Sequence, residues 1–259
     1  MATVQEHPRG HGGDVLQRDP DRILPLLWRR TKPARTGRPP KLTVDAVVTA
    51  AIRLADEGGL EATSMARLAD DLGVGTMTLY SYVPSHDELV DLMIDGVLLG
   101  RELPGPDDPR PTHWRDQVML YADRTRAVYA AHPWLAQVSQ IRPPIGPGML
   151  AEREYVLSCV ARAARPEQVN TAAVTIQMFV TAAARGVAEN ELVRRASGQS
   201  TDEWWLHRAR LWEDWFDVER HPTMTGLWNA GKFTDGPDEQ ADAAYAYGLG
   251  LILDGISPA

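Results

Sequence analysis

The sequence predicts an all-α protein in which a small N-terminal helical domain is followed by a larger helical one. Three observations lead to this fold class. Apolar residues recur at helical spacing in one stretch after another, glycine and proline mark the breaks between stretches, and no stretch shows the alternation of a half-buried strand. With 259 residues, of which 44% are hydrophobic and 24% charged, the chain suits two modest domains or one large one.

The N-terminal region is polar and basic, and we expect little regular structure in it. Residues 1–22 are Gly-rich and without periodicity, which indicates disorder. A short apolar patch at 23–28 is interrupted by Pro25, and the sequence does not indicate where it docks. Residues 29–41 hold six basic residues and no acid, and three prolines with a glycine prevent a helix, so this segment is predicted to be an extended basic arm.

Four helices are predicted between residues 43 and 100. Thr43 is a plausible N-cap for the first helix, and the pair Gly58-Gly59 ends it. Gly73 supplies the left-handed residue of a tight turn after the second helix. The four expected helices span residues 43–58, 64–72, 76–82 and 85–100.

The rest of the chain is also predicted to be helical. A proline-rich stretch at 104–111 marks a linker or loop. The long helices expected beyond it span about 112–131, 147–164, 167–196, 201–219 and 238–255. The sequence thus divides into a tail of residues 1–40 with the basic arm at 29–41, a domain of residues 41–100, and a domain of residues 101–259.

The second and third helices have the spacing of a helix-turn-helix DNA-binding unit: about nine residues, a turn that opens with glycine, and a short helix. The helix at 64–72 must hold the helix at 76–82 so that the exposed side chains of the latter reach base edges in the major groove. Ala69 is small where the two helices would cross. Val74 would anchor the turn in the core, and Leu79 would anchor the helix at 76–82. The side chains left to face outward are Thr76, Met77, Thr78, Ser81 and Tyr82.

Residues 60–83 resemble the signature of the TetR family of repressors. Gly73-Val74, Leu79-Tyr80 and the aromatic Tyr82 carry the resemblance, which continues into 87–92. Residues 132–147 look like part of a tetracycline-repressor-type C-terminal domain. The resemblance implies a three-helix DNA-binding domain joined by a connecting helix to a larger helical domain for ligand binding and dimerisation. A twofold dimer would place its recognition helices one turn of DNA apart, on a near-palindromic operator.

The resemblance also implies the roles of the DNA-binding residues. Ser64 and Arg67 would lie near phosphates or the groove edge. The bases would be contacted by Thr76, Met77 and Thr78, and the backbone by Tyr80 and Tyr82. His86 stands where members usually carry a lysine that contacts phosphate. Because histidine is largely neutral at pH 7, we expect a weaker anchor there.

Charge is unevenly distributed along the chain. The net charge is −8, yet residues 1–42 hold nine Lys/Arg against four Asp/Glu, which leaves 18 against 31 elsewhere. Residues 43–100 contain two basic residues and ten acids. Since phosphate neutralisation supplies most non-specific affinity, we expect the arm to reach the neighbouring minor groove. A solvated tail is the alternative. The arm's candidate contacts are Arg35, Arg38 and Lys41.

The family resemblance implies an effector pocket among the C-terminal helices. Its candidate residues are Tyr121, Arg124, Trp134, Met149, Gln177 and Met178, and ordinary core packing is the alternative for the aromatic and methionine side chains. Arg124 and Gln177 are more informative, because polar groups on an apolar face need a partner, either a ligand or simply Glu154.

Two further segments of the C-terminal half carry expectations. Residues 204–216 hold five large aromatic side chains, which would pack on the body, pack on a partner subunit, or line a pocket for a flat aromatic effector. Residues 167–190 and 238–255 are the expected homodimer interface. The second is rich in alanine and glycine, and two such helices from each subunit would form a four-helix contact.

Other classes of protein find little support in the sequence. It lacks metal-ligand spacing, a nucleophile elbow and a phosphate-binding loop, so we expect no enzyme, no metal and no cofactor. Cys159 lies in an apolar helical stretch, which favours a buried core residue. No apolar run approaches the roughly 20 residues of a membrane span. The N-terminus lacks the apolar centre of a secretory signal. A soluble cytoplasmic protein is expected.

Two functions remain open. One is a repressor released from DNA by an unidentified small molecule. The other is a DNA-binding regulator without a ligand, controlled by a protein partner or by its abundance. Activation is also compatible with the motif, because the position of the operator decides it.

Overall fold

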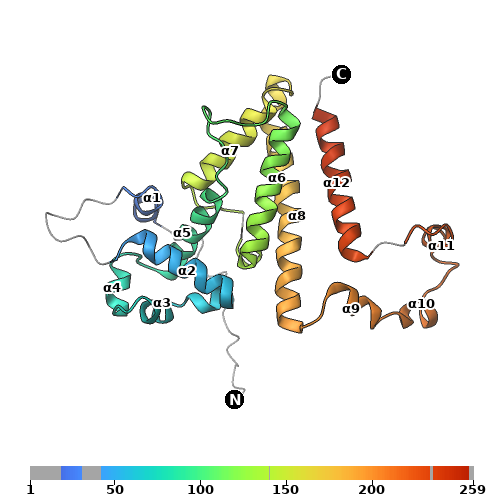
Figure 1. The fold of residues 1–259 in the computed structure, drawn as a ribbon, viewed down its shortest axis with the longest axis horizontal. Coiled ribbons are helices and arrows are strands. Elements are labelled where there is room, and N and C mark those ends of the chain that lie inside the picture. The colour runs from blue at the N-terminus through green and yellow to red at the C-terminus, as the bar shows by residue number, and fades with distance from the viewer. Residues whose placement is uncertain (1–18, 31–41, 140, 234–235, 257–259) are drawn as a thin grey trace, which may run out of the picture. The chain divides into compact units, whose positions relative to one another are not determined.

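The computed structural model describes residues 19–30, 42–139, 141–233 and 236–256, and all regular structure in them is helical (Figure 1). The predicted all-α class is therefore confirmed. The expected disorder of residues 1–18 and the expected arm contacts Arg35, Arg38 and Lys41 lie outside the described residues.

The chain divides into two compact units. The first contains the described residues up to Gly100 together with 141–150, and the second contains 101–139 and the residues from Ala151 onward. The division drawn from the sequence keeps all of 101–259 together, and the structure adds a grouping of 141–150 with the first unit. Its cause is the close packing of this segment on a helix of the first unit.

The first unit is built around the predicted helix-turn-helix. Its helices are α1 (Pro20–Leu27), α2 (Val44–Gly58), the 3₁₀ turn η1 (Leu60–Thr63), α3 (Met65–Asp71), α4 (Thr76–Tyr80) and α5 (His86–Leu99). Side-chain oxygens of Thr43, Ser64 and Ser85 accept backbone N–H groups at the starts of α2, α3 and α5, at 3.1, 3.4 and 3.1 Å. Each cap satisfies a donor that the first helical turn leaves without a partner.

Helix α1 was not predicted, and it corrects the expectation of an irregular tail up to residue 22. The Asp19 carboxylate caps it by accepting the Asp21 N–H at 3.0 Å, and proline is tolerated at its first position. The apolar side chains of Ile23, Leu26 and Leu27 are buried along one face, at the helical spacing of three and four residues. The short apolar patch therefore docks as a helix.

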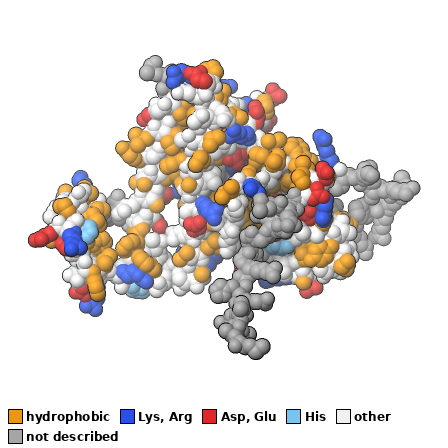
Figure 2. Space-filling view, turned by 180° about the vertical axis from the view of Figure 1, so that it is seen from behind, with side chains coloured by type: hydrophobic (Ala, Val, Ile, Leu, Met, Phe, Trp, Pro, Cys, Tyr) orange, Lys and Arg blue, Asp and Glu red, His pale blue; other side chains and the backbone are white. Residues whose placement is uncertain are grey.

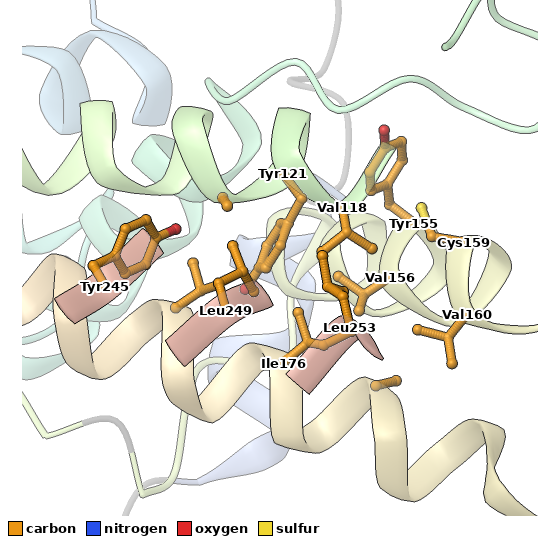
Figure 3. Close-up of a cluster of buried hydrophobic side chains, with 13 residues drawn as sticks. Val118, Tyr121, Tyr155, Val156, Cys159, Val160, Ile176, Tyr245, Leu249 and Leu253 are labelled. Carbon is orange, nitrogen blue, oxygen red and sulfur yellow. The ribbon is translucent and has the colours of Figure 1, made fainter. Parts of the chain in front are cut away.

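Four long helices and two 3₁₀ turns form the body of the second unit. They are α6 (Trp114–Ala131), η2 (Pro133–Gln137), α7 (Pro147–Val160, which begins in the first unit), η3 (Pro166–Gln168), α8 (Val169–Ser197) and α12 (Pro237–Ile256). Tyr121 from α6, Val156 from α7, Ile176 from α8 and Leu249 from α12 meet in one buried cluster (Figure 3).

One helix in the described part of the chain, α8, is long and apolar enough by composition to cross a membrane. A core helix of a globular protein passes the same test, and α8 packs extensively against α6. Its buried stripe consists of Ala173, Ile176, Val180, Ala184 and Ala188. Only 28% of the most apolar 18-residue stretch of this helix is buried in the single chain, which leaves a largely exposed outer face.

The helix expected at 201–219 is replaced by two short helices, α9 (Thr201–Leu206) and α10 (Arg210–Asp214), and an unpredicted helix α11 (Pro222–Asn229) follows. None of the three contains a buried residue. A helix of this length depends on packing for most of its stability, and the described residues of the single chain do not bury this segment. Hydrophobic side chains accordingly lie exposed over it, at the left of Figure 2.

Candidate functional site

The turn between α3 and α4 fixes the direction in which α4 leaves. Gly73 has φ of 65°, a left-handed conformation that favours glycine. Its N–H donates to the Asp70 carbonyl at 3.1 Å, and the Val74 N–H donates to the Ala69 carbonyl at 3.0 Å. These bonds close the end of α3 and start the chain toward α4.

Helix α4 is held by one apolar edge. Leu79 and Val83 are fully buried, as are Leu68 and Ala69 on α3, so the small residue expected at the helix crossing does lie in the packed layer. Val74 is half-buried at the turn. A helix of five residues has little stability of its own, so this contact is what fixes its position.

The opposite side of α4 is open to solvent. The Met77 side chain is 81% exposed, Thr78 and Tyr80 are exposed, and Thr76 and Tyr82 are half-buried. The structure therefore brings the predicted base-contacting residues onto one short exposed helix. A methionine and two threonines offer one apolar and two hydroxyl contacts, which suits the edges of base pairs in a major groove.

Ser64 and Arg67 lie exposed at the start of α3. The Ser64 hydroxyl oxygen accepts the Arg67 N–H at 3.4 Å, so it caps α3 while its own hydrogen remains available to an external acceptor. The Arg67 guanidinium forms no ion pair with any residue that the structure describes. Arg53, by contrast, donates to Asp71 at 2.5 Å and to Glu57 at 3.0 Å, and these bonds raise the pKa of Arg53.

His86 is half-buried and joins the start of α5 to η1. Its Nε2 lies 2.8 Å from the Thr63 hydroxyl oxygen, and that hydroxyl donates to the Leu60 carbonyl at 2.6 Å. Because the Thr63 hydrogen is already used, the His86 Nε2 carries a hydrogen and donates it to Thr63. The side chain expected to anchor a phosphate thus has one nitrogen engaged within the domain.

The second unit contains a cluster of polar side chains around Glu152 of α7. The carboxylate accepts hydrogen bonds from Arg101 at 2.5 Å, from the Tyr121 hydroxyl at 2.8 Å and from the Gln177 amide at 3.2 Å. Arg101 also donates to Thr125 at 3.0 Å. Burial and the neighbouring Glu152 charge raise the pKa of Tyr121 well above its usual value. The phenol therefore acts as a donor to the carboxylate.

This cluster unites two of the six effector candidates, Tyr121 and Gln177, with two residues that sequence reasoning missed, Arg101 and Glu152. No local pattern marked the missed pair, because a charged residue next to an apolar stretch looks like any solvated position. They are paired across 51 positions of sequence.

The other candidates lie elsewhere. Arg124 donates to the carbonyls of Arg101, at 3.0 Å, and Glu102, so backbone groups and not Glu154 satisfy it. Trp134 is buried in η2, Met178 is 69% exposed on the outside of α8, and Met149 belongs to the first unit. Met178 therefore does not line an internal pocket of the single chain.

The second unit also contains an aromatic groove on its surface and a thiol in its core. A groove of about 470 Å³ on α9 and α10 is lined by Trp204, Trp205, Arg208, Arg210, Leu211 and Trp215. The Arg208 guanidinium lies 3.8 Å from the centre of a Trp204 ring, a cation–π contact. Cys159 is fully buried, and burial raises the pKa of its thiol to about 11, so it is a core residue and a poor nucleophile.

Comparison with known proteins identifies both halves of the chain. Residues 47–93 match the family described as bacterial regulatory proteins, tetR family, and residues 106–259 match the tetracyclin repressor-like C-terminal domain. The chain is 38% identical over 237 residues to the HTH-type transcriptional repressor DrrR1 of Streptomyces coeruleorubidus, which covers 91% of this chain and 84% of that protein.

Solved structures are also similar. The TetR family protein ActR of Streptomyces coelicolor in complex with actinorhodin is 28% identical, with a TM-score of 0.67 over 83% of this chain and 95% of ActR. ActR in complex with (S)-DNPA is 29% identical, with a TM-score of 0.65 over 84% of this chain and 98% of ActR.

Proposed function

Since the chain belongs to the TetR family of bacterial regulatory proteins, we propose that it is a repressor that binds a near-palindromic operator as a homodimer and releases it when a small molecule binds. As a DNA-binding regulator of this family it is not an enzyme. The exposed face of α4, held in place by the buried Leu79 edge, is the observation that carries the proposal. We place its action in the cytoplasm.

In this proposal the bases are read by Thr76, Met77 and Thr78. Arg67, with no internal ion pair among the described residues, neutralises a phosphate, and Ser64, Tyr80 and Tyr82 donate to the backbone. His86, at the start of α5, contributes a further contact to the DNA backbone.

Replacing Thr78 by valine tests the reading face. Valine keeps the shape of threonine and removes its hydroxyl, and the internal bond at this position uses the Thr78 backbone carbonyl, which remains. Losing a base contact is worth about 1–3 kcal/mol, so operator affinity should fall about 5- to 150-fold, with non-specific binding and melting temperature unchanged. Fluorescence anisotropy on a duplex selected from a random pool measures this. Thr49→Val, at an exposed threonine of α2, is the matched control; equal effects of the two variants would remove Thr78 from the interface.

The basic arm supplies the electrostatic share of the affinity in this proposal. Because residues 1–40 include the docked helix α1, deleting them would disturb the fold as well as the arm. Substituting Arg35, Arg38 and Lys41 together by alanine avoids this. If all three contact phosphates, the slope of log affinity against log salt should become shallower by about 3. An unchanged slope would identify the arm as a solvated tail.

The outer faces of α8 and α12 are the proposed dimer interface. Each helix buries one stripe in its own core and exposes apolar side chains on the other, among them Met178, Tyr247 and Leu251. A groove of about 390 Å³ runs between the two helices, and its lining includes Thr171, Ala172 and Leu251. An apolar face of this kind is normally covered in a stable protein.

The tryptophan-rich segment, residues 204–228 of α9–α11, fits the same dimer. None of the residues of α9, α10 and α11 is buried by the described part of the single chain. Of the expectations drawn from the sequence, contact with the partner subunit is the one we propose, because burying five tryptophans would supply much of the association energy. A groove for a flat aromatic effector is the alternative.

The Glu152 cluster is the proposed effector-sensing group, and two observations support this. It is a buried polar network in the C-terminal domain, and the similar protein ActR is known in complex with small molecules. A ligand could exchange for one of the three donors on Glu152. The polar groups also satisfy each other without a ligand, which favours the second candidate, a regulator without an effector. Thermal-shift screening with amphipathic aromatic compounds separates the two: a compound that stabilises the free protein and releases the selected duplex supports the switch.

A further inference from the structure

Helix α1 precedes the region that matches the family, which begins at residue 47, so membership of the family assigns it no role. Beyond its buried apolar face, three polar contacts hold it. The Trp28 indole N–H donates to the Ile145 carbonyl at 3.1 Å, and Arg29 donates to Asp45 of α2 at 2.6 Å. Arg22 lies 3.7 Å from Glu88 of α5, a carboxylate that is itself buried. Arg29, expected in the arm, thus belongs to the anchorage of α1.

These contacts join three segments that are distant in sequence. Helix α1 contacts α5 through Arg22, and the two residues that follow the helix, Trp28 and Arg29, contact the segment 141–150 and α2. The bond from Trp28 to Ile145 spans 117 positions. A surface helix with no structural purpose would need only its apolar face, whereas α1 fixes three neighbours at once.

The segment that Trp28 contacts is also held from α5. The Asp95 carboxylate accepts the N–H groups of Gly148 and Met149 at 2.9 and 3.3 Å, which caps the start of α7. A Cβ atom at Gly146 would lie 2.3 Å from the Asp95 carboxyl carbon, and one at Gly148 would lie 2.4 Å from the Asp95 carbonyl oxygen. Only glycine permits this approach of backbone to helix.

We propose that α1 and Asp95 form a two-sided clasp on residues 144–149, and that α1 thereby sets how firmly the DNA-binding unit holds the start of α7. Helix α7 also carries Glu152, one turn beyond Met149. The regulatory meaning rests on the proposed function, in which a ligand acts at Glu152. The clasp itself does not depend on that function. A firm clasp pre-organises the first unit and lowers the entropy lost when DNA binds.

Hydrogen exchange of the full-length protein, followed by mass spectrometry, tests the clasp without any ligand. Trp28→Phe removes the indole donor and keeps an aromatic ring, so peptides covering 142–150 should exchange about 2- to 10-fold faster. Leu27→Ala, at a side chain only 3% exposed, should undock α1 and give a larger increase. Leu24→Ala on the outer face of the same helix, where the side chain is 37% exposed, is the matched control and should change nothing.

Operator affinity, measured on the selected duplex, tests whether the clasp affects DNA binding. Loosening the clasp should weaken binding about 3- to 10-fold for Leu27→Ala and leave Leu24→Ala unchanged. Unchanged exchange at 142–150 in both Trp28→Phe and Leu27→Ala would overturn the clasp. Faster exchange with unchanged affinity would overturn its regulatory role. If the wild-type protein selects no duplex, the proposed function fails, and the exchange result still decides whether the clasp exists.

Discussion

Replacing Leu251 by arginine is expected to convert the protein to monomers and to lower operator affinity by about 100-fold or more. The side chain is 54% exposed in the single chain and lines the groove between α8 and α12. Burying an unpaired guanidinium in an apolar interface costs several kcal/mol, more than such a contact gains from one leucine. Two linked half-site contacts bind far more tightly than one, so loss of the dimer removes the avidity as well as the contact.

Sedimentation equilibrium gives the oligomeric state, and anisotropy on the selected duplex gives the affinity. Met119→Arg is the matched control, because Met119 is an apolar side chain of α6 that is 39% exposed and lies outside the proposed interface. A Leu251→Arg protein that remains dimeric and binds normally would show that the groove between α8 and α12 is not part of the interface, and would leave the partner contact proposed for α9–α11 as the dimer contact.

Replacing Gly148 by alanine is expected to destabilise the protein by about 2–3 kcal/mol, a fall in melting temperature of about 5–10 °C. The new Cβ would lie 2.4 Å from the Asp95 carbonyl oxygen and 2.8 Å from the Leu99 nitrogen. Both are backbone atoms, so no side-chain rotation relieves the clash and the start of α7 must move away from α5. The loss should exceed the roughly 1 kcal/mol that alanine gains over glycine within a helix.

Differential scanning calorimetry measures the change. Gly226→Ala is the control, since a Cβ there meets nothing within 4 Å and the substitution should cost no stability. If Gly148→Ala melts with the wild type, then the segment 144–149 does not pack on α5 as described, and the clasp proposed for α1 loses its second side.

The helix-turn-helix could be predicted from the sequence because its determinants are local. The glycine that turns the chain after α3, the side chain at Leu79 that anchors α4, and the caps at Thr43 and Ser85 each act within a few residues. A pattern of this kind is complete within one stretch of chain. The outward face of α4 follows from the same spacing.

The partners of isolated polar residues could not be predicted in this way. Glu152 meets Tyr121 across 31 positions and Arg101 across 51, and nothing near any of the three residues in sequence marks the pairing. The same holds for Asp95 and Gly148, which are separated by 53 positions. Sequence reasoning found that Gln177 needs a partner, and the packed helices decided which.

The sequence by itself determined the all-α class and the exposed face of α4 in the helix-turn-helix, because helical periodicity and a glycine turn are properties of neighbouring residues. Only the tertiary structure decided that residues 20–27 form a docked helix, that 141–150 belong with the first unit, and that the segment 201–229 breaks into short helices. In each of these cases the outcome depends on whether a distant surface is available to bury an apolar face. The described residues provide that surface for α1, whereas they bury no residue of α9–α11.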